Sequence, residues 1–523
     1  MAAPFLETAQ FLHIQAGQAP NLTVVPDAEP NHELMYEHSR EAFDRYLDER
    51  DQAQVVDKIE GEELHAVQES VRAWAEGAGL LHVPDKLEDR LRYYTDFSEE
   101  MAVEKIVGLV DFLEKEHSDK ISKVELDATR SFVESAFSMY EARPGDGSVA
   151  PDADGSFAFV VPARMGRNHP DYGQEVEPTI PAFRYLPNEL RAHMMIGLPP
   201  FVIDTYQQNE QGKRGYLVLA PVFEDMLTDL GASMSFLSRA GTNNINAAVD
   251  FAYERFGVNT IGLGAVLPAL TNYGKTITNK NVTLTTGHGG TTEFINRIVE
   301  SSLQGRKPES IGVLGLGAIG EAIARILANK YPDSKINIFD VKENRIDRVK
   351  ATGETFVGRT SVKDVIDNSD IIVSAVTDRL DLEALGVNPL NGRVAVDDSQ
   401  PGSVDPEQAE RMGGAVRWAI GSDPTGKVAR RRGYDYATMV DPHADLFGCE
   451  AEAASIAAYG YELEARGLPR AAIARIIDKV AVHGRVSVQK TRYIGALFTK
   501  FGIVPSAPQA FGRPVVLPNQ RAA

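Results

Sequence analysis

The stretch from Ile311 to Asp340 constrains the fold of this 523-residue chain more than any other. An apolar run, Ile311–Leu314, leads into the turn Gly315-Leu316-Gly317-Ala318-Ile319-Gly320, then a helical run, then a second apolar run that ends at Asp340. The order strand, glycine turn, helix, strand and acid predicts a Rossmann-type parallel sheet that binds a dinucleotide. The alternative is a glycine turn in an α/β fold that binds nothing.

Each glycine of this turn has a separate physical role in a dinucleotide site. Gly315 permits the tight turn, Gly317 lets a pyrophosphate approach the backbone, and Gly320 lets the helix pack closely on the strand. The helix that opens at Ala318 and Ile319 presents N–H groups and its positive dipole end to the phosphates. We therefore expect these five residues to bind the cofactor.

Asp340 follows Gly320 by twenty positions, where a carboxylate accepts the adenosine ribose hydroxyls and repels a 2′-phosphate. This favours NADH, with NADPH still possible. Further on, one predicted buried strand runs from Asp370 to Val376 and ends at the small residues Ser374, Ala375 and Val376, and another runs from Arg393 to Asp398. The candidates at the ends of these strands are Ser374–Thr377 and Asp398–Gly402. Ligands of open parallel sheets lie beyond the carboxyl ends of the strands, so these residues are expected to line the nicotinamide half. Ordinary strand-to-helix turns are the alternative.

Composition limits the class of protein. A mass of 57.1 kDa predicts two or three domains, and 43% hydrophobic with 24% charged residues is ordinary for a soluble globular protein. No apolar run approaches the roughly 20 residues that span a bilayer, and no basic segment followed by an apolar one opens the chain, so we expect a cytoplasmic protein. One cysteine, and no HExxH or paired Cys/His spacing, predicts neither a disulfide framework nor a metal site.

The net charge of −20 is concentrated in one region. Residues 1–150 hold 32 acidic and 14 basic residues, whereas the rest of the chain is nearly balanced. Without a concentrated basic surface, nucleic acid is not an expected partner.

Helical periodicity in residues 1–150 predicts an all-α bundle. One stripe is expected to be buried (Val103, Ile106, Val107, Val110, Leu113), with Glu104, Lys105, Asp111 and Glu114 outside it. The acidic surface is either a solvated face or a site for a protein partner or self-association.

Turn formers and changes of periodicity divide the chain. The expected parts are an acidic helical domain (1–142), a linker (143–156), an α/β substrate-binding domain (157–304), a Rossmann domain (305–440), C-terminal helices (441–504) and a Pro-rich tail over the surface (505–523).

Two glycine-bearing loops fall in the substrate-binding domain. One contains Gly262 and Gly264, and the other runs from Thr285 through Thr286, Gly287 and His288 to Thr291. The second precedes a helix, so its N–H groups and hydroxyls either cap that helix or hold an anion or a carbonyl oxygen. His288 alone is typical of a loop histidine.

Cys449 lies just before a run of high helix propensity, Ala451–Tyr461. A cysteine at a helix start has its thiolate stabilised by the helix dipole, although a buried, inert cysteine is the common case. His443, six residues earlier, is a candidate to activate the thiol or return a proton.

Residues 157–499 resemble the cyanobacterial long-chain acyl-ACP reductase family. The resemblance rests on blocks in the same order: 215–227, the Gly262 loop, Thr285-Thr286-Gly287, the dinucleotide turn, Val396-Asp397 and 442–453. In the last block, the residues that match are Pro442, Phe447, Cys449, Ala451 and Glu452. The acidic region 1–150 has no counterpart in the family. Where the family has an arginine suited to NADPH, this chain has Asp340-Val341, which favours NADH, although Lys342 and Arg345 remain within reach of a phosphate.

The resemblance implies reduction of an acyl thioester, carried by acyl-carrier protein or CoA, to an aldehyde. Cys449 would be the nucleophile, and the loop with Thr286, Gly287, His288 and Thr291 would stabilise the oxyanion. Two other functions are compatible with the sequence. One is a dehydrogenase of the shikimate or glutamyl-tRNA reductase type without cysteine chemistry. The other is a non-catalytic nicotinamide-binding module whose acidic domain recruits a partner.

Overall fold

The computed structural model describes residues 32–80, 99–163, 179–187, 190–191, 194, 198–223, 234–376, 378–399, 402–428, 430 and 439–517. The chain forms two compact units. The first comprises Met1–Pro144 and Thr179–Phe201, and the second comprises Gly145–Pro178 and Val202–Ala523. The predicted fold class is confirmed: a helical region precedes an α/β part with two sheets, of which the six-stranded one is parallel throughout. No helix within the described ranges is long and apolar enough to cross a membrane.

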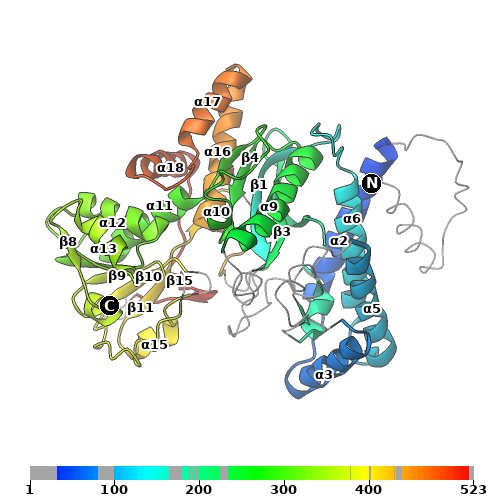
Figure 1. The fold of residues 1–523 in the computed structure, drawn as a ribbon, viewed down its shortest axis with the longest axis horizontal. Helices are drawn as coiled ribbons and strands as arrows, with labels where there is room; N and C mark the ends of the chain where they lie inside the picture. Colours follow the sequence, from blue (N-terminus) through cyan, green and yellow to red (C-terminus); the bar gives the residue numbers. More distant parts are fainter. Residues whose placement is uncertain are drawn as a thin grey trace, which may run out of the picture. The chain divides into compact units, whose positions relative to one another are not determined.

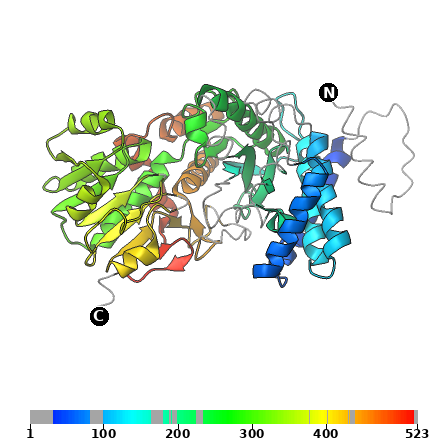
Figure 2. The ribbon, with the colours of Figure 1, turned by 60° about the horizontal axis from the view of Figure 1, so that its bottom comes forward.

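The first unit is a helical bundle (Figures 1 and 2). Its helices are α2 (His32–Gln54), α3 (Gly61–Gly77), α5 (Glu99–His117) and α6 (Lys123–Glu141). Val103, Ile106, Val110 and Leu113 are buried along α5, as the periodicity predicts. The prediction that Lys105 lies outside the buried stripe is wrong, because only 5% of this residue is exposed. Burial lowers the pKa of its ammonium group to about 8.

The segment Thr179–Phe201 also belongs to this bundle, although the sequence predicted it as part of the substrate-binding domain. Its short helix η1 (Pro181–Tyr185) packs against α6, where the hydroxyl of Tyr185 donates to Glu125 at 2.8 Å. The ring of Phe201 meets that of Phe132 edge-on, with centroids 4.9 Å apart. These contacts join residues that are far apart in the sequence, so no local sequence pattern predicts them.

The second unit begins with a five-stranded sheet in the order β2-β3-β1-β4-β5. Its strands are β1 (Gly155–Ala163), β2 (Phe201–Thr205), β3 (Arg214–Phe223), β4 (Thr260–Leu263) and β5 (Thr283–Thr285). The strand β1 runs parallel to β3 and β4, and β4 runs parallel to β5. Along the chain, α9 (Met234–Phe256) lies between β3 and β4, and α10 (Leu267–Leu270) lies between β4 and β5. The helix predicted around Phe223–Leu230 lies outside the described residues.

The linker predicted at 143–156 is held against the end of α9. Asp152 accepts from buried Arg255 at 2.8 Å, and the backbone N–H groups of Gly145 and Gly147 donate to Glu254. The chain therefore enters β1 at a fixed position.

Helix α11 (His288–Leu303) leads from the first sheet into a second, six-stranded parallel sheet, ordered β11-β10-β9-β6-β7-β8. The strands are β6 (Ser310–Leu314), β7 (Lys335–Phe339), β8 (Phe356–Gly358), β9 (Ile371–Ser374), β10 (Val394–Asp397) and β11 (Ala415–Trp418). The helices around this sheet are α12 (Ala318–Lys330), α13 (Glu343–Lys350), α14 (Val362–Asp367) and α15 (Pro406–Arg411). Chain order places the crossover between β6 and β9, which is the Rossmann topology.

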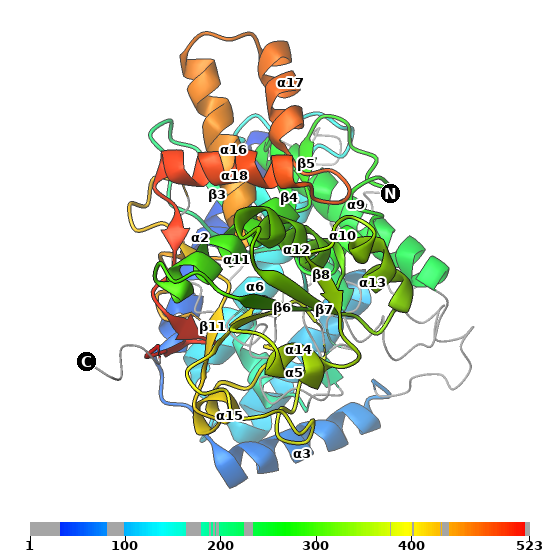
Figure 3. The ribbon, with the colours of Figure 1, turned by 90° about the vertical axis from the view of Figure 1, so that its left-hand side faces the viewer.

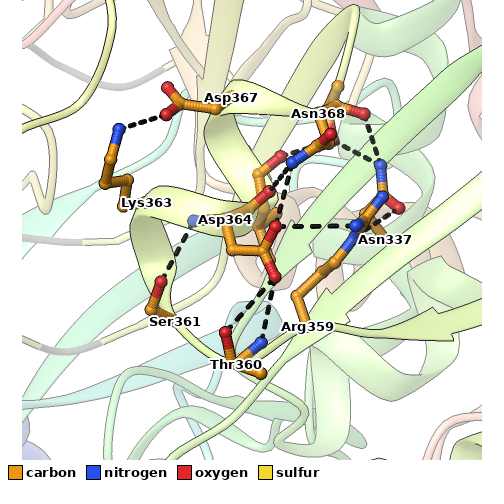
Figure 4. A network of polar contacts seen from close by, with 10 residues as sticks. Asn337, Arg359, Thr360, Ser361, Lys363, Asp364, Asp367 and Asn368 are labelled. Atoms are coloured by element: carbon orange, nitrogen blue, oxygen red, sulfur yellow. Dashed lines mark hydrogen bonds and ion pairs between the residues drawn. The ribbon is translucent and has the colours of Figure 1, made fainter.

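A polar network fixes one edge of this sheet (Figure 4). Asn337 in β7 is fully buried; its amide donates to Asn368 O at 2.6 Å and accepts from Arg359 Nε at 2.9 Å. Asp364 accepts from Thr360, and the hydroxyl of Ser361 caps α14. These hydrogen bonds pair the buried polar groups of the network and so fix the positions of β7, β8 and α14 relative to one another.

The C-terminal part consists of α16 (Gly448–Ala465), α17 (Arg470–Val480), α18 (Val488–Phe501) and short strands. α16 and α17 form a hairpin, and α18 lies near α12 (Figure 3). The short strands are β12 (Gly421–Ser422), β13 (Asp445–Leu446), β14 (Val504–Pro505), β15 (Gln509–Ala510) and β16 (Arg513–Pro514). The tail does not merely cover the surface, because Ala510 is buried and Phe511 packs on Trp418 at 5.0 Å.

Candidate functional site

The glycine turn after β6 has the geometry of a dinucleotide cradle. Gly315 has a φ of 80°, and a Cβ atom added there would lie 2.4 Å from Ala375 O. At Gly320 an added Cβ would lie 1.8 Å from Gly315 O, so only glycine allows this helix to approach the strand. At Gly317 an added Cβ would meet no atom within 4 Å. That open side of the backbone is where a pyrophosphate needs room.

Helix α12 starts directly from this turn. Its N-cap, Gly317, has no side chain to accept the first helical N–H groups, and Ala318 and Ile319 are half-buried. The first turn of a helix has N–H groups without intrahelical acceptors, and these groups bind phosphate well. The residues present therefore fit the pyrophosphate of a nicotinamide dinucleotide.

Asp340 follows β7 and is 6% exposed. Its carboxylate accepts from the backbone N–H of Leu316 at 2.7 Å and of Lys342 at 2.8 Å, and from Arg345 Nη1 at 3.0 Å. Burial alone would raise its pKa, but these hydrogen bonds and the arginine charge outweigh burial, so the pKa of Asp340 lies below its ordinary value. The carboxylate is thus ionised and directly attached to the glycine turn.

The residues after β9 differ in what they offer a ligand. Ser374 is fully buried, and its hydroxyl bonds the hydroxyl of Ser403 at 2.7 Å. Ser374 therefore has a structural role and does not face a ligand. Ala375 and Val376 are partly exposed and lie beside Gly315. The next position, Thr377, lies outside the described residues.

Two adjacent carboxyl groups lie at the end of β10, where Asp397 is the last residue of the strand and Asp398 follows it. Asp397 is fully buried and accepts from the backbone N–H groups of Ser399, Ser403 and Val404. Burial raises the pKa of Asp397 to about 6. Burial and the charge of Asp397 raise the pKa of Asp398 to about 7. A carboxyl group of that pKa at the carboxyl end of a Rossmann strand is suited to proton transfer near neutral pH.

Cys449 is the second residue of α16 and is half-buried. This confirms the predicted helix start, where the dipole favours a thiolate. The residue opposite it is Gly287, the left-handed N-cap of α11 with φ 72°. A Cβ atom added at Gly287 would lie 2.0 Å from Cys449 Cβ.

The starts of α11 and α16 therefore touch through backbone. A Cβ at Gly290 would lie 1.9 Å from Gly448 O, and a Cβ at Gly448 would lie 2.4 Å from Thr291 N. Gly262 in β4 also joins this contact, since a Cβ there would lie 2.7 Å from Ala453 Cβ and 3.6 Å from Cys449 O. Gly264 instead packs against Phe159 in the core of the sheet. Of the two predicted loop glycines, one reaches the cysteine turn.

The prediction that the N–H groups of residues 286–291 hold an oxyanion needs correction at three positions. Thr286 N donates to Val482 O at 3.0 Å, and Thr291 N donates to Gly287 O at 3.2 Å. Gly290 N donates to the carboxylate of Glu452 at 2.6 Å, which also accepts from the hydroxyl of Thr285. The fully buried carboxylate of Glu452 accepts from the first turn of α11. The N–H groups of Thr286, Gly290 and Thr291 therefore already donate to acceptors within the protein and are not available to an oxyanion.

The sequence identifies Glu452 only as part of the block that resembles the family, and its role here comes from the fold. It lies three residues after Cys449 and so on the same side of α16. Burial raises the pKa of Glu452 to about 7, against the hydrogen bonds that it accepts. The i, i+3 spacing from the cysteine is the signal in the sequence that points to it.

Two histidines were candidates. His443 is exposed in the turn that Asp441 stabilises by accepting from His443 N at 3.2 Å. His288 follows Gly287 directly, and its Nδ1 atom is buried without a hydrogen-bond partner among the described residues. Burial lowers the pKa of His288 to about 4, so this imidazole is neutral at pH 7. The histidine adjacent to the cysteine contact is therefore His288.

The start of α16 also touches the second sheet. The ring of Phe447, two residues before Cys449, packs edge-on against Trp418 with centroids 5.6 Å apart. Trp418 is the last residue of β11 and the register partner of Asp397 in β10. Leu446 pairs with Gly421 just beyond that strand. Cys449 thus follows residues fixed at the carboxyl end of the second sheet and contacts glycines near the carboxyl ends of β4 and β5 in the first.

Comparison with known proteins identifies one domain. Residues 310–412 match the model of the NAD-binding domain of 6-phosphogluconate dehydrogenase. These residues cover β6 to α15, including the glycine turn, Asp340, Ser374 and Asp397. No curated protein matches the chain. No group of histidine, cysteine, aspartate and glutamate residues suited to a metal ion occurs in the described part.

Solved structures resemble parts of the chain. CmnK is 18% identical over 24% of this chain and 39% of its own, with a TM-score of 0.20, so the chain spans well under two thirds of that protein. Quinate dehydrogenase from Corynebacterium glutamicum in complex with NAD is 16% identical over 50% of this chain and 87% of its own, with a TM-score of 0.25. L-tryptophan dehydrogenase from Nostoc punctiforme is 14% identical over 63% and 90%, with a TM-score of 0.26.

Likenesses at these scores carry no conclusion about activity. The family match and the geometry of the glycine turn agree with each other: the chain contains an NAD-binding Rossmann domain of the kind found in dehydrogenases.

Proposed function

We propose that this protein is an oxidoreductase that reduces an acyl thioester to an aldehyde through an acyl-enzyme on Cys449. The observation that carries the proposal is the environment of the only cysteine. Its helix start packs on Gly287, the N-cap of α11, and on Gly262 of the first sheet, while Phe447 packs on Trp418 of the NAD-binding sheet. A nucleophile between the carboxyl ends of both sheets has access to substrate and cofactor together.

In the first step, the thiolate of Cys449 attacks the carbonyl carbon of the thioester. A bond forms between that carbon and Sγ, the carbon bond to the carrier sulfur breaks, and the carrier leaves as a thiol after taking up a proton. Asp398, with its pKa of about 7, is our candidate for the donor of that proton.

When bound, NADH would supply a hydride to the acyl carbon of the Cys449 thioester. The resulting alkoxide reforms a carbonyl, its carbon–sulfur bond breaks, and aldehyde and the Cys449 thiolate are released. The cofactor-binding residues proposed for this step are Gly315, Gly317, Ala318, Ile319 and Gly320, with Ala375 and Val376 on the nicotinamide side. Asp340 supports NADH over NADPH, because its ionised carboxylate repels a 2′-phosphate.

The thiolate needs stabilisation, and the dipole of α16 is the source we favour. A neutral His288 argues against a cysteine–imidazolium pair. For the oxyanion we propose the hydroxyl of Thr286, which is buried and has no hydrogen-bond partner among the described residues. His443 remains a secondary candidate for proton return.

The donor of the acyl group is proposed to be acyl-carrier protein or acyl-CoA in the cytoplasm. The sequence has a short basic run, Arg430–Arg432, and we propose that it meets the phosphates of a pantetheine arm or of CoA. Arg430 is the residue of this run that the structure describes. The acidic helical unit is proposed to bind a protein partner or a second copy of the chain.

Radiolabelled acyl-CoA tests the proposal. The purified protein is incubated with acyl-CoA without NADH, denatured and separated. The wild type should retain label that neutral hydroxylamine removes, and Cys449→Ser should retain none that hydroxylamine removes. Ser455→Ala on the same helix is the matched control and should label like the wild type.

Absence of label from the wild type with both acyl-CoA and acyl-carrier protein would reject cysteine catalysis. If the Cys449→Ser variant still turned over substrate, a dehydrogenase without cysteine chemistry would be favoured. With NADH binding but no turnover, the protein would be a nicotinamide-binding module.

A further inference from the structure

The segment between α17 and α18, residues 481–487, contacts both halves of the site. On one side, Val482 O accepts from Thr286 N and Val482 N donates to the hydroxyl of Thr285, both at 3.0 Å. On the other side, Nη1 of Arg485 lies 3.5 Å from Glu321 Oε2 on α12. Figures 1 and 3 show the adjoining α18 beside α12. The segment is therefore anchored next to the cysteine turn and reaches the dinucleotide helix.

Glu321 immediately follows Gly320, in the first turns of α12. It already accepts from Arg325 at 2.9 Å and from Arg348 at 2.6 Å. Arg485 makes the longest of the three contacts, and its side chain is 59% exposed. An exposed, lengthened ion pair of this kind contributes little free energy. Within this cluster of described residues, three guanidinium groups share one carboxylate, so positive charge exceeds negative charge.

The glycine turn itself offers a pyrophosphate only backbone N–H groups and a helix dipole, because no lysine or arginine occurs between Gly315 and Gly320. A dinucleotide brings two negative charges to this helix end. Arginine binds phosphate through paired N–H groups, and releasing Arg485 leaves Glu321 with two partners.

We propose that Arg485, which belongs to the C-terminal helical part and not to the NAD-binding domain, exchanges Glu321 for the pyrophosphate of the bound dinucleotide. Its position is fixed by the backbone bonds of Val482 and by the left-handed turn at Gly484, with φ 73°. Binding of the cofactor thereby tightens the same segment that supports Thr285 and Thr286. The inference concerns cofactor binding and does not require the thioester chemistry.

Binding assays with the full chain test this role. Affinities for NADH, ADP and adenosine are measured for the wild type, Arg485→Ala and Arg485→Lys at two salt concentrations. We expect Arg485→Ala to bind NADH and ADP about tenfold more weakly, as for loss of a charged hydrogen bond, and adenosine unchanged within twofold. Arg485→Lys should recover part of the loss, and the salt dependence of ADP binding should fall in Arg485→Ala.

The matched control is Arg475→Ala on α17, whose guanidinium bonds only a carbonyl oxygen of its own helix among the described residues. It should bind all three ligands like the wild type. The proposal is overturned if Arg485→Ala binds ADP within twofold of the wild type. It is also overturned if adenosine binding weakens as much as ADP binding, because the effect would then be structural.

Discussion

Cys449 and Gly287 meet across two helix starts, with the Cβ atom of the cysteine 2.0 Å from the place that a Cβ atom on the glycine would occupy. Gly287 also has a φ of 72°, which side chains other than glycine rarely adopt. Two independent restrictions, backbone conformation and space, thus require glycine opposite the cysteine.

Gly287→Ala should displace the start of α16 and change the reactivity of Cys449. The left-handed conformation costs about 1–2 kcal/mol, and the clash with Cys449 adds to it. Thermal unfolding and the rate of alkylation by iodoacetamide measure the two effects. Gly305→Ala is the control, since Gly305 has a φ of 79° and open space around it. Equal losses in both variants would mean that contact with Cys449 is unimportant.

Glu452 should make stability fall as pH rises from about 4.5 to about 7. Its pKa in the folded protein is raised to about 7, so across this range the folded state binds more protons than the unfolded state. The loss is at most about 3 kcal/mol and is complete above the folded pKa.

Urea unfolding of wild type and Glu452→Gln at pH 5 and pH 8 isolates this contribution. The variant should be less stable at both values, because a side-chain amide accepts fewer hydrogen bonds, but the difference should be smaller at pH 8. A difference independent of pH would show that Glu452 does not titrate in this range.

Asp340→Asn should shift preference from NADH towards NADPH by about tenfold in the ratio of dissociation constants, because the repulsive charge is removed while an oxygen acceptor remains. It also releases Arg345, which then becomes available to a 2′-phosphate. Titration of cofactor fluorescence measures both affinities. In Asp340→Asn/Arg345→Ala the gain for NADPH should disappear. Unchanged cofactor preference in the single variant would show that Asp340 does not face the ribose.

Asn337→Leu should destabilise the NAD-binding domain by about 2–4 kcal/mol, because Asn368 O and Arg359 lose a buried partner (Figure 4). Asn388→Ala, at an exposed position, should stay within about 0.5 kcal/mol of the wild type. Chemical denaturation provides the comparison, and similar values for both variants would contradict the proposed role of the network.

The Rossmann domain was predictable because its signal is local. The strand from Ile311, the three glycines of the turn and Asp340 occur within thirty residues, and each reflects a steric or electrostatic requirement of its own segment. The helix start at Cys449 was predictable for the same reason, from the propensity of the residues that follow it.

The partners of those residues were not predictable in this way. Lys105 is buried despite its place on a polar face, and Glu452 takes the N–H group of Gly290 that was expected to face a substrate. Each outcome depends on packing between segments far apart in the chain, for which one sequence has no local pattern.

The sequence by itself determined the dinucleotide turn, the acidic helical region and the single cysteine at a helix start, because glycine conformation, charge and helix propensity act over short distances. Only the tertiary structure decided that Gly287 lies against Cys449, that Glu452 caps α11 and that Arg485 reaches α12. Those relationships arise where buried groups from separate elements must satisfy one another, and that requirement exists only once the chain has folded.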